Sequence, residues 1–409
     1  MKCRHCESEL SLPLVDLGCA PPSNAYLTEL TVKEPEKWFP LRVLVCENCW
    51  LAQTEDFARR EELFSADYAY FSSFSRSWLA HCERYVADAT ARFDLGPASH
   101  VVEIAANDGY LLQYVQARNI PCTGVEPTAS TAAAARAKGI PMVEEFFGVD
   151  SARKLAAQDR QADLIAANNV LAHVPEINDF VAGFSLLLKP QGVATFEFPH
   201  LLRLITDGLF DTIYHEHFSY LSLTAVVRVL GANGLGVFDV EEHPFQGGSL
   251  RVFAQRSDTG KHPRDSRVDK LLEREARAGM TTAGYYADFQ TRIDSIKNDF
   301  LYFLLDAKRL GKSVAAYGAA AKGNTLMNYA GVRPDLMPFV VDRNPAKQGK
   351  YMPGSHIPIV DEARLRNLRP DYVIVLPWNL KAEVMEQLDY IGTWGGRFVT
   401  ALPHFGIMP

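Results

Sequence analysis

The sequence predicts a multidomain α/β protein: a small N-terminal zinc-binding domain followed by two domains built on parallel sheets. Three observations predict this. Two Cys-x-x-Cys pairs lie near the N-terminus, strand and helix patterns alternate from about residue 100 to residue 198, and a second alternation starts at Lys312. Strands that alternate with helices at this spacing are typical of doubly wound parallel sheets.

Composition narrows the class of protein. A chain of 409 residues is longer than one ordinary hydrophobic core needs, so we expect two or three domains. The net charge of -7 argues against a partner that is a nucleic acid. No apolar run approaches membrane-spanning length and no signal-peptide pattern opens the sequence, so we expect a cytoplasmic protein without a membrane partner, a monomer or a homodimer.

Residues 1–65 are expected to form the zinc-binding domain. Prolines interrupt its short apolar runs up to about Gln53, which indicates a loop-rich segment. Four thiolates complete a tetrahedral zinc site and leave no open position, so the metal is expected to be structural. The alternative is four unrelated buried or free cysteines, which paired Cys-x-x-Cys motifs disfavour. The expected ligands are Cys3, Cys6, Cys46 and Cys49.

Residues 66–256 are expected to form the second domain. This domain begins with an aromatic and polar segment from Asp67 to about Val86, and the second half of that segment is expected to be helical. The alternation follows, with strands over 100–104, 121–126, 163–167 and 192–198 and helices over 111–118 and 130–138. Short apolar strands of this kind are buried in a parallel sheet.

The turn after the first of these strands is a candidate ligand site. It reads Glu103-Ile104-Ala105-Ala106-Asn107-Asp108-Gly109, and such a turn brings backbone N–H groups and a helix N-terminus to a ligand. Glu126 closes the next strand, where an acidic residue can accept hydrogen bonds from two ribose hydroxyls. Asn168 closes the strand after that. The alternative is a ligand-free α/β domain with incidental polar turns.

A second candidate site is the run Tyr214-His215-Glu216-His217, which aromatic residues flank. Four hydrogen-bonding or ionisable side chains in a row are costly to bury. A histidine beside a carboxylate can be tuned to accept a proton near neutral pH, which favours catalysis. One alternative is a metal site, for which His-x-His lacks a third ligand. The other is a hydrogen-bonded cluster with a structural role.

Residues 257–310 are expected to be a helical connector, and residues 311–409 a third, α/β domain. Its strands are expected over 313–317, 339–342, 372–376 and 397–399. The turn after the first strand contains small residues and Lys322, which suit a phosphate group. Asp342 ends the next strand, as a ribose-binding acid would. The alternative is a plain turn with a surface lysine.

Arg251 follows the glycine turn Gln246-Gly247-Gly248 at the start of a strand. We expect it either to reach a phosphate or carboxylate group or to be a solvated surface charge.

With these motifs in order, the chain resembles, over nearly its whole length, the C-methyltransferases that branch nucleotide-linked deoxy sugars at C3, next to a 4-keto group. The resemblance rests on the cysteine pairs, the turn after residue 103, the Tyr-x-Glu-His core and four short segments: Asp67–Ser73, Gly124–Pro127, Asn168–His173 and Ala321-Lys322. It implies a central class I S-adenosylmethionine-dependent methyltransferase domain with a Rossmann-like fold. It also implies a C-terminal Rossmann-like domain that binds the nucleotide sugar.

The resemblance assigns roles to residues. His217 is the favoured base that forms an enolate, Tyr214 orients the sugar or holds the enolate oxygen, and Glu216 holds the imidazole tautomer; these roles can be permuted. The methyl donor is expected on Glu103, Asn107, Asp108, Gly109, Glu126, Pro127, Phe146 and Asn168. The nucleotide sugar is expected on Tyr68, Tyr70, Arg251, Lys322, Asn324 and Asp342.

Two departures from the family pattern stand out. Ala105 and Ala106 replace residues that are often Gly and Ser, which we expect to be a mild change. Gln246 stands where many relatives have His.

Two other functions compete with this interpretation. A nicotinamide-dependent nucleotide-sugar oxidoreductase would also use two Rossmann-like domains, but the first turn lacks the Gly-x-Gly-x-x-Gly motif. A zinc-stabilised protein that binds nucleotide sugars without catalysis is the other alternative.

Overall fold

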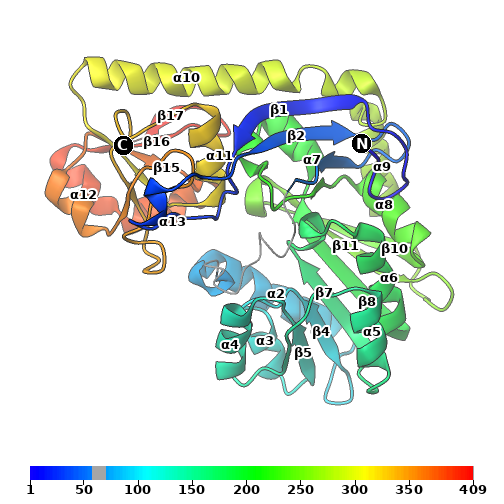
Figure 1. The fold of residues 1–409 in the computed structure, drawn as a ribbon. Coiled ribbons are helices and arrows are strands. Elements are labelled where there is room, and N and C mark those ends of the chain that lie inside the picture. The colour runs from blue at the N-terminus through cyan, green and yellow to red at the C-terminus, as the bar shows by residue number, and fades with distance from the viewer. Residues whose placement is uncertain (58–70, 409) are drawn as a thin grey trace.

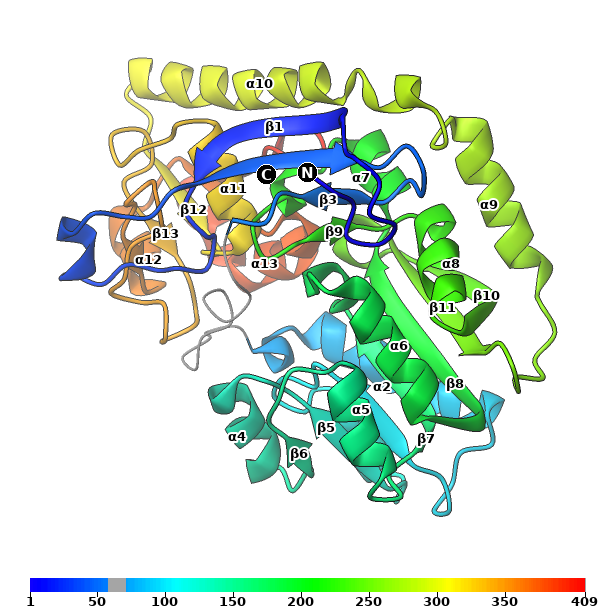
Figure 2. The same cartoon turned by 45° about the vertical axis from the view of Figure 1, so that its right-hand side comes forward.

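The structure is a computed structural model that describes residues 1–57 and 71–408. The described residues form three sheets. Figures 1 and 2 show one long helix along the top of the molecule, beside the N-terminal sheet and the C-terminal domain, with the seven-stranded sheet below them. The sheet orders are β1-β2-β3-β9, β10-β11-β8-β7-β4-β5-β6 and β14-β13-β12-β15-β16-β17. Over these described ranges no helix is both long enough and apolar enough to cross a membrane.

The N-terminal sheet is antiparallel and contains β1 (Leu12–Ala20), β2 (Phe39–Val45), β3 (Ala52–Thr54) and β9 (Ser219–Tyr220). The sequence predicted only loop-rich structure here, and that was wrong for these strands. The prediction treated two prolines as strand breakers, but both lie within strands. Pro13 lies at an irregularity in the pairing of β1, and Pro40 opposes Cys19 beside a second irregularity in that pairing. Proline is tolerated at such positions of a strand.

Strand β9 joins this sheet from far along the sequence. Ser219 pairs with Gln53 and Tyr220 with Ala52, so the residues directly after His217 extend the sheet of the N-terminal segment. The first predicted domain is therefore built together with a piece of the second.

The seven-stranded sheet confirms the predicted doubly wound domain. Strands β4 to β8 pair in parallel, and β11 and β10 extend the sheet in antiparallel fashion. The strands are β4 (Val101–Ile104), β5 (Cys122–Val125), β6 (Met142–Val143), β7 (Ala162–Asn168), β8 (Leu188–Pro199), β10 (Leu235–His243) and β11 (Ser249–Arg256). The helices are α2 (Arg76–Arg92), α3 (Leu112–Gln116), α4 (Ala129–Ala137), α5 (Val149–Ala156), α6 (Ile177–Leu187), α7 (Leu201–Asp207) and α8 (Leu223–Ala232).

The six-stranded sheet confirms the second alternation. Strands β12 to β16 are parallel, and β17 pairs antiparallel with β16. The strands are β12 (Val314–Tyr317), β13 (Val340–Val341), β14 (Ile359–Val360), β15 (Tyr372–Val375), β16 (Arg397–Thr400) and β17 (Gly406–Met408). The helices are α11 (Ala321–Tyr329), α12 (Ala363–Leu368) and α13 (Lys381–Gln387).

The predicted helical connector contains α9 (Ser266–Ala278) and α10 (Phe289–Arg309). Helix α10 buries Phe289, Ile293, Phe300, Leu304 and Ala307, which follow the spacing of one helix face. This face shares a single apolar core with β1, with α7 and with the C-terminal sheet. Figures 1 and 2 show α10 along β1 from both directions. Burial of one stripe therefore fixes three parts of the chain together.

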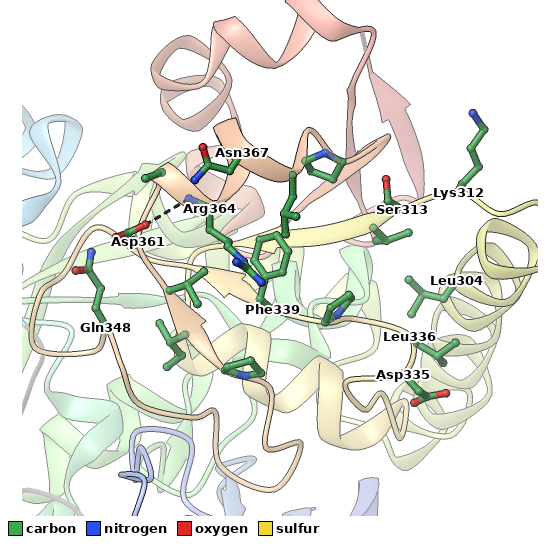
Figure 3. A pocket seen from close by; sticks show the side chains of 18 of the residues that line it. Leu304, Lys312, Ser313, Asp335, Leu336, Phe339, Gln348, Asp361, Arg364 and Asn367 are labelled. Carbon is green, nitrogen blue, oxygen red and sulfur yellow. Dashed lines mark hydrogen bonds between the residues drawn. The ribbon is translucent and has the colours of Figure 1, made fainter.

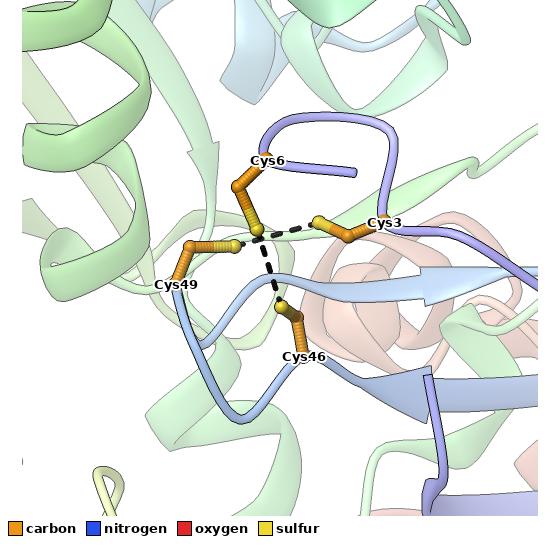
Figure 4. A group of neighbouring side chains, drawn as sticks. All are labelled: Cys3, Cys6, Cys46 and Cys49. Carbon is orange, nitrogen blue, oxygen red and sulfur yellow. Dashed lines mark hydrogen bonds between the residues drawn. The ribbon is translucent and has the colours of Figure 1, made fainter. Parts of the chain in front are cut away.

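The four predicted zinc ligands come together at one end of the N-terminal sheet (Figure 4). The sulfur atoms of Cys3 and Cys49 lie 3.5 Å apart, as do those of Cys6 and Cys46, and all four sulfur atoms are within 4.8 Å of one another. Tetrahedral zinc–thiolate bonds of about 2.3 Å place sulfur atoms about 3.8 Å apart, so this group fits the ion. With four protein ligands the zinc is structural.

Zinc should stabilise the N-terminal sheet, since three of the four ligands are buried and their thiolates need a cation. We expect the purified protein to carry one zinc per chain by elemental analysis. Cys3→Ser should lose the metal and lower the midpoint of thermal unfolding by several degrees. Cys19→Ser is the matched control, because Cys19 is exposed in the same sheet and lies outside the cluster. Full zinc content in Cys3→Ser would contradict the assignment.

Candidate active site

A cleft opens at the carboxyl ends of β4, β5 and β7, where parallel sheets bind ligands. Its volume of about 340 Å³ is within the range of small-molecule sites. Four parts of the chain contribute to its walls: the N-terminal segment, the central sheet, the segment that ends at His217 and the C-terminal domain. The predicted site residues among its walls are Asn107, Glu126, Pro127, Phe146, Asn168, Tyr214, Glu216, His217 and Lys322.

The turn after β4 has an unusual backbone. Ala105 and Asn107 have φ values of 57° and 48°, in the left-handed region that side chains disfavour. Glycine would relieve the strain at Ala105, and the expectation that the two alanines are a mild change stays a prediction. The Asn107 side chain accepts a hydrogen bond from the backbone N–H of Ser72 at 2.9 Å, which ties the turn to the 3-10 turn Ser72–Phe74 that precedes α2.

Glu126 closes β5 and faces this turn. One carboxylate oxygen accepts the N–H of Asn107 at 3.0 Å, and the other accepts the N–H and the hydroxyl of Thr128. Burial raises the pKa of Glu126, and these hydrogen bonds oppose the rise. Nearby, Asn168 is 5% exposed, and within the described part of the chain its side-chain oxygen has no hydrogen-bond partner. A buried acceptor of this kind takes a donor from a ligand or from water.

The structure places three residues of the predicted donor site behind the turn, away from the cleft wall. Glu103 is fully buried, and burial raises the pKa of its carboxyl group well above the ordinary value. Asp108 lies 3.6 Å from the ammonium of Lys138. Gly109 has a φ of 76°, and an added Cβ would lie 2.3 Å from Ile140. These residues shape the turn.

His217 lies in a buried part of the cleft, 9% exposed. Its Nδ1 is 2.7 Å from the backbone oxygen of Thr212, which belongs to the 3-10 turn Phe210–Thr212. A carbonyl oxygen only accepts hydrogen bonds, so Nδ1 carries the proton and Nε2 carries the lone pair. Burial, and then the charge of His173, lower the pKa of His217 well below its ordinary value. The ring is therefore neutral at pH 7 and can accept a proton at Nε2.

The other members of the Tyr-x-Glu-His run point in different directions. The ring of Tyr214 lies 4.0 Å from that of His217. Nε2 of His215 faces the backbone oxygens of Phe39 and Pro40, on β2. Glu216 accepts hydrogen bonds from Asn24 at 2.7 and 2.9 Å. The carbonyl of Thr212, rather than Glu216 as predicted, holds Nδ1 of His217.

Two cleft residues carried no predicted role. The ring of His173 lies 4.5 Å from that of His217, and burial lowers the pKa of His173 to about 4. Its place in the family-like segment Asn168–His173 was the signal that pointed to it. Asn24 left no sequence signal, because its partner lies 192 residues away.

Lys322 stands on the cleft wall in the first turn of α11, so the alternative of a surface lysine was wrong. Its ammonium donates to the side-chain oxygens of Gln246 at 3.0 Å and Asn379 at 3.4 Å, and lies 4.9 Å from the ring centre of Trp378. Burial lowers the pKa of Lys322, and the charge of Asp211 opposes this. Burial in turn raises the pKa of Asp211 to about 6.

Other predicted substrate residues lie off the cleft wall. Asn324 is fully buried and donates to the backbone oxygen of Ser23 at 2.5 Å. Asp342 accepts the N–H of Ala319 at 2.8 Å, just before α11. Tyr68 and Tyr70 lie outside the described residues.

Arg251 is neither a surface charge nor a wall of the cleft. It is 4% exposed and forms an ion pair with Glu197, which also lies within 2.9 Å of His81. The carboxylate it reaches therefore belongs to the protein itself.

A second, larger hollow of about 920 Å³ lies at the opposite edge of the C-terminal sheet (Figure 3). Leu304, Leu336, Phe339, Asp361 and Arg364 are among the residues that line it, and Arg364 extends toward Phe339. None of the predicted site residues lines it.

Family models match three consecutive segments: a zinc binding domain over residues 3–64, a methyltransferase domain over residues 78–240, and a C-methyltransferase C-terminal domain over residues 244–403. The chain is 31% identical over 402 residues to the C-methyltransferase NovU of Streptomyces niveus, across 98% of this chain and 95% of that protein. The chain belongs to this C-methyltransferase family. The C-methyltransferase is thus an S-adenosylmethionine-dependent enzyme, and the nicotinamide-dependent and non-catalytic alternatives are set aside.

Two solved methyltransferase structures are similar to part of this C-methyltransferase. The magnesium protoporphyrin IX methyltransferase ChlM of Synechocystis PCC 6803, with bound SAM, is 15% identical and covers 44% of this chain and 79% of its own, with a TM-score of 0.34. A SAM-dependent methyltransferase of Anabaena variabilis is 13% identical and covers 49% of this chain and 96% of its own, with a TM-score of 0.39.

We expect Glu126 to anchor the ribose of the methyl donor in this C-methyltransferase. Its carboxylate stands at the end of β5 beside the cleft, and a hydrogen bond to a charged group contributes about 1.5–3 kcal/mol. Glu126→Gln should therefore weaken donor binding by about 10- to 100-fold in calorimetry. Glu144→Gln is the matched control, since Glu144 is exposed and pairs with Arg136. Equal affinity in Glu126→Gln and wild type would place the donor elsewhere.

Proposed function

We propose that this enzyme methylates the carbon alpha to the keto group of a nucleotide-linked 4-keto-deoxy sugar through an enolate. The observation that supports it best is the composition of one cleft. The cleft is lined by a neutral histidine, His217, by Glu126 at the donor side and by Lys322 of the C-terminal domain. A base, a donor site and a place for a phosphate are the three parts that this reaction needs.

The proposed chemistry begins at Nε2 of His217. A proton alpha to a ketone is moderately acidic, and Nε2 takes it while the C–H electron pair moves into the enolate. Bound S-adenosylmethionine supplies a sulfonium methyl group, and the C–S electron pair leaves with sulfur as the new C–C bond forms. The bond from Nδ1 to Thr212 keeps the accepting nitrogen turned to the cleft.

Tyr214 and His173 flank the proposed base on the cleft wall. A phenol O–H beside the reacting carbon can donate to the developing enolate oxygen, which stabilises charge where it forms. We assign this role to Tyr214, because an unperturbed phenol with a pKa near 10 is a poor base at pH 7.

The nucleotide half of the substrate is proposed to bind the C-terminal wall. Lys322, Lys347 and the first turn of α11 meet there, and α11 is nine residues long. Its free backbone N–H groups and two ammonium groups suit the negative charge of a diphosphate. Gln246 and Asn379 hold the ammonium of Lys322 in place.

Solvent exchange tests the base. In deuterated water, with a nucleotide-linked 4-keto-deoxy sugar and no methyl donor, the wild-type enzyme should incorporate deuterium alpha to the ketone, and His217→Asn should lose about 10²–10⁴-fold in rate. Protonation of the ring abolishes the base as the pH falls through its pKa. Because burial lowers that pKa, the loss attributed to His217 should occur below about pH 6.5.

Tyr214→Phe is the comparison variant, and it should keep exchange faster than His217→Asn. Wild-type exchange in His217→Asn together with none in Tyr214→Phe would make the tyrosine the base. With the methyl donor added, mass spectrometry should find one methyl group gained by a sugar of this class. No gain across a panel of such sugars would refute the substrate class.

Binding of the nucleotide half can be tested at Lys322. Free nucleoside diphosphate should compete with the sugar substrate but not with the methyl donor. Lys322→Met should weaken the binding of the nucleoside diphosphate by about 10- to 100-fold. Lys381→Met is the matched control, because Lys381 is exposed in the nearby helix α13. Competition with the methyl donor instead would reassign the C-terminal wall.

A further inference from the structure

An asparagine of the zinc-binding segment reaches into the cleft and contacts the Tyr-x-Glu-His run. The side-chain nitrogen of Asn24 lies 2.7 and 2.9 Å from the two carboxylate oxygens of Glu216, and both residues line the cleft. We propose that Asn24 is a positioning residue that holds Glu216 in place as an ionised carboxylate. This inference rests on the proposed function in one respect only, namely that Glu216 takes part in the reaction.

The orientation of the Asn24 amide follows from its surroundings. The hydroxyl of Tyr26 donates to the backbone oxygen of Ala319 at 2.5 Å and also points its proton toward the side-chain oxygen of Asn24, which lies 3.3 Å away. A flipped amide would turn its oxygen toward the Glu216 carboxylate, where two acceptors would repel each other. The N–H groups therefore face Glu216.

The backbone around Asn24 is anchored to the C-terminal domain. The backbone oxygen of Ser23 accepts a hydrogen bond from the buried Asn324 of α11. Since this bond and the contact from Tyr26 to Ala319 flank Asn24 on both sides, its side chain has a defined position over the cleft. A fixed donor loses little entropy when it binds a carboxylate.

The zinc-binding segment also holds the backbone that follows Glu216. Thr54 donates to the backbone oxygen of His217 at 3.1 Å. Arg4, between two of the cysteine ligands, donates to the backbone oxygens of Phe218 and Thr54. The same N-terminal segment thus fixes both the main chain and the carboxylate of the run.

Hydrogen bonds from a neutral amide stabilise the charged form of a carboxylate. Among the described residues, the titratable groups near Glu216 include Tyr26, whose pKa the charge of Glu216 raises, and Lys347, whose ammonium lies 5.1 Å from the Tyr26 ring. They also include the histidines His173 and His217, which line the same cleft. When His217 takes up a proton it becomes a cation in a buried site. An ionised Glu216 on the same wall offsets that charge.

Asn24→Asp tests the proposal because it keeps the shape of the side chain and replaces the donor by a second carboxylate. Two carboxylates at this distance resist joint ionisation, so the higher of the two apparent pKa values of the pair lies above that of Glu216 alone. The pKa of Glu216 can be followed by carbon-13 NMR of labelled glutamate, with the resonance identified by its loss in Glu216→Gln. We expect it to rise by about one pH unit or more in Asn24→Asp.

The catalytic readout is the pH profile of alpha-deuterium exchange without methyl donor. Its acidic limb should move to higher pH in Asn24→Asp, since the carboxylate pair takes up its first proton at a higher pH than Glu216 alone does. In a Glu216→Gln background, Asn24→Asp should leave the limb unmoved. Glu36→Gln is the matched control, because Glu36 docks the same segment on Gly354, away from the cleft. It should leave the limb unchanged.

The outcomes separate this proposal from the proposed function. Zinc content and thermal unfolding equal to wild type would show that Asn24→Asp is folded. An unchanged Glu216 pKa in that folded variant overturns the proposal, whichever substrate the enzyme uses. A higher KM with an unmoved acidic limb also overturns it, since Asn24 would then bind the sugar itself. Absence of exchange in the wild type, with a raised Glu216 pKa in Asn24→Asp, would instead refute only the proposed chemistry.

Discussion

The short stretch from Phe210 to Tyr220 is the constraint on which the rest of the structure depends. It starts in the apolar core that α10 shares with the C-terminal sheet, and it ends as β9 on the edge of the N-terminal sheet. Thr325 of α11 donates to the backbone oxygen of Ile213 at 2.9 Å. Three parts of the chain thus hold one segment. Because that segment carries the Tyr-x-Glu-His run, its side chains have defined positions only in the assembled molecule.

Burial dominates the electrostatics of the cleft. It lowers the pKa of His217 and of Lys322, and it raises the pKa of Glu126 and of Asp211. Each shift disfavours a charged group, and hydrogen bonds or opposite charges oppose several of them. A site that removes water from its own groups also strengthens their interactions with a charged ligand. The groups whose burial costs free energy are therefore the same groups that are proposed to bind the ligands and to carry out the reaction.

In both Rossmann-like domains, a carboxylate accepts a hydrogen bond from a backbone N–H of the first strand–helix turn. Glu126, at the end of β5, accepts the N–H of Asn107, and Asp342, just after β13, accepts the N–H of Ala319. In each half a carboxylate after the second strand fixes the turn after the first. The two differ in access, since Glu126 lines the cleft and Asp342 does not. Because only Glu126 lines the cleft, the structure supports the proposed donor role of Glu126 more strongly than a ribose-binding role of Asp342.

Local pattern alone determined much of this protein. The cysteine pairs predicted the zinc site, and the apolar runs predicted the parallel strands β4, β5, β7, β8, β12, β13, β15 and β16. Both depend on residues close in sequence. The tertiary structure decided what depends on distant partners. Glu216 meets Asn24, Arg251 pairs with buried Glu197, and β9 completes the N-terminal sheet. Contacts across such separations leave no periodic trace in a single sequence. They form only when the shared core brings the segments together, and the tautomer of His217 and the burial of Lys322 follow from the same packing.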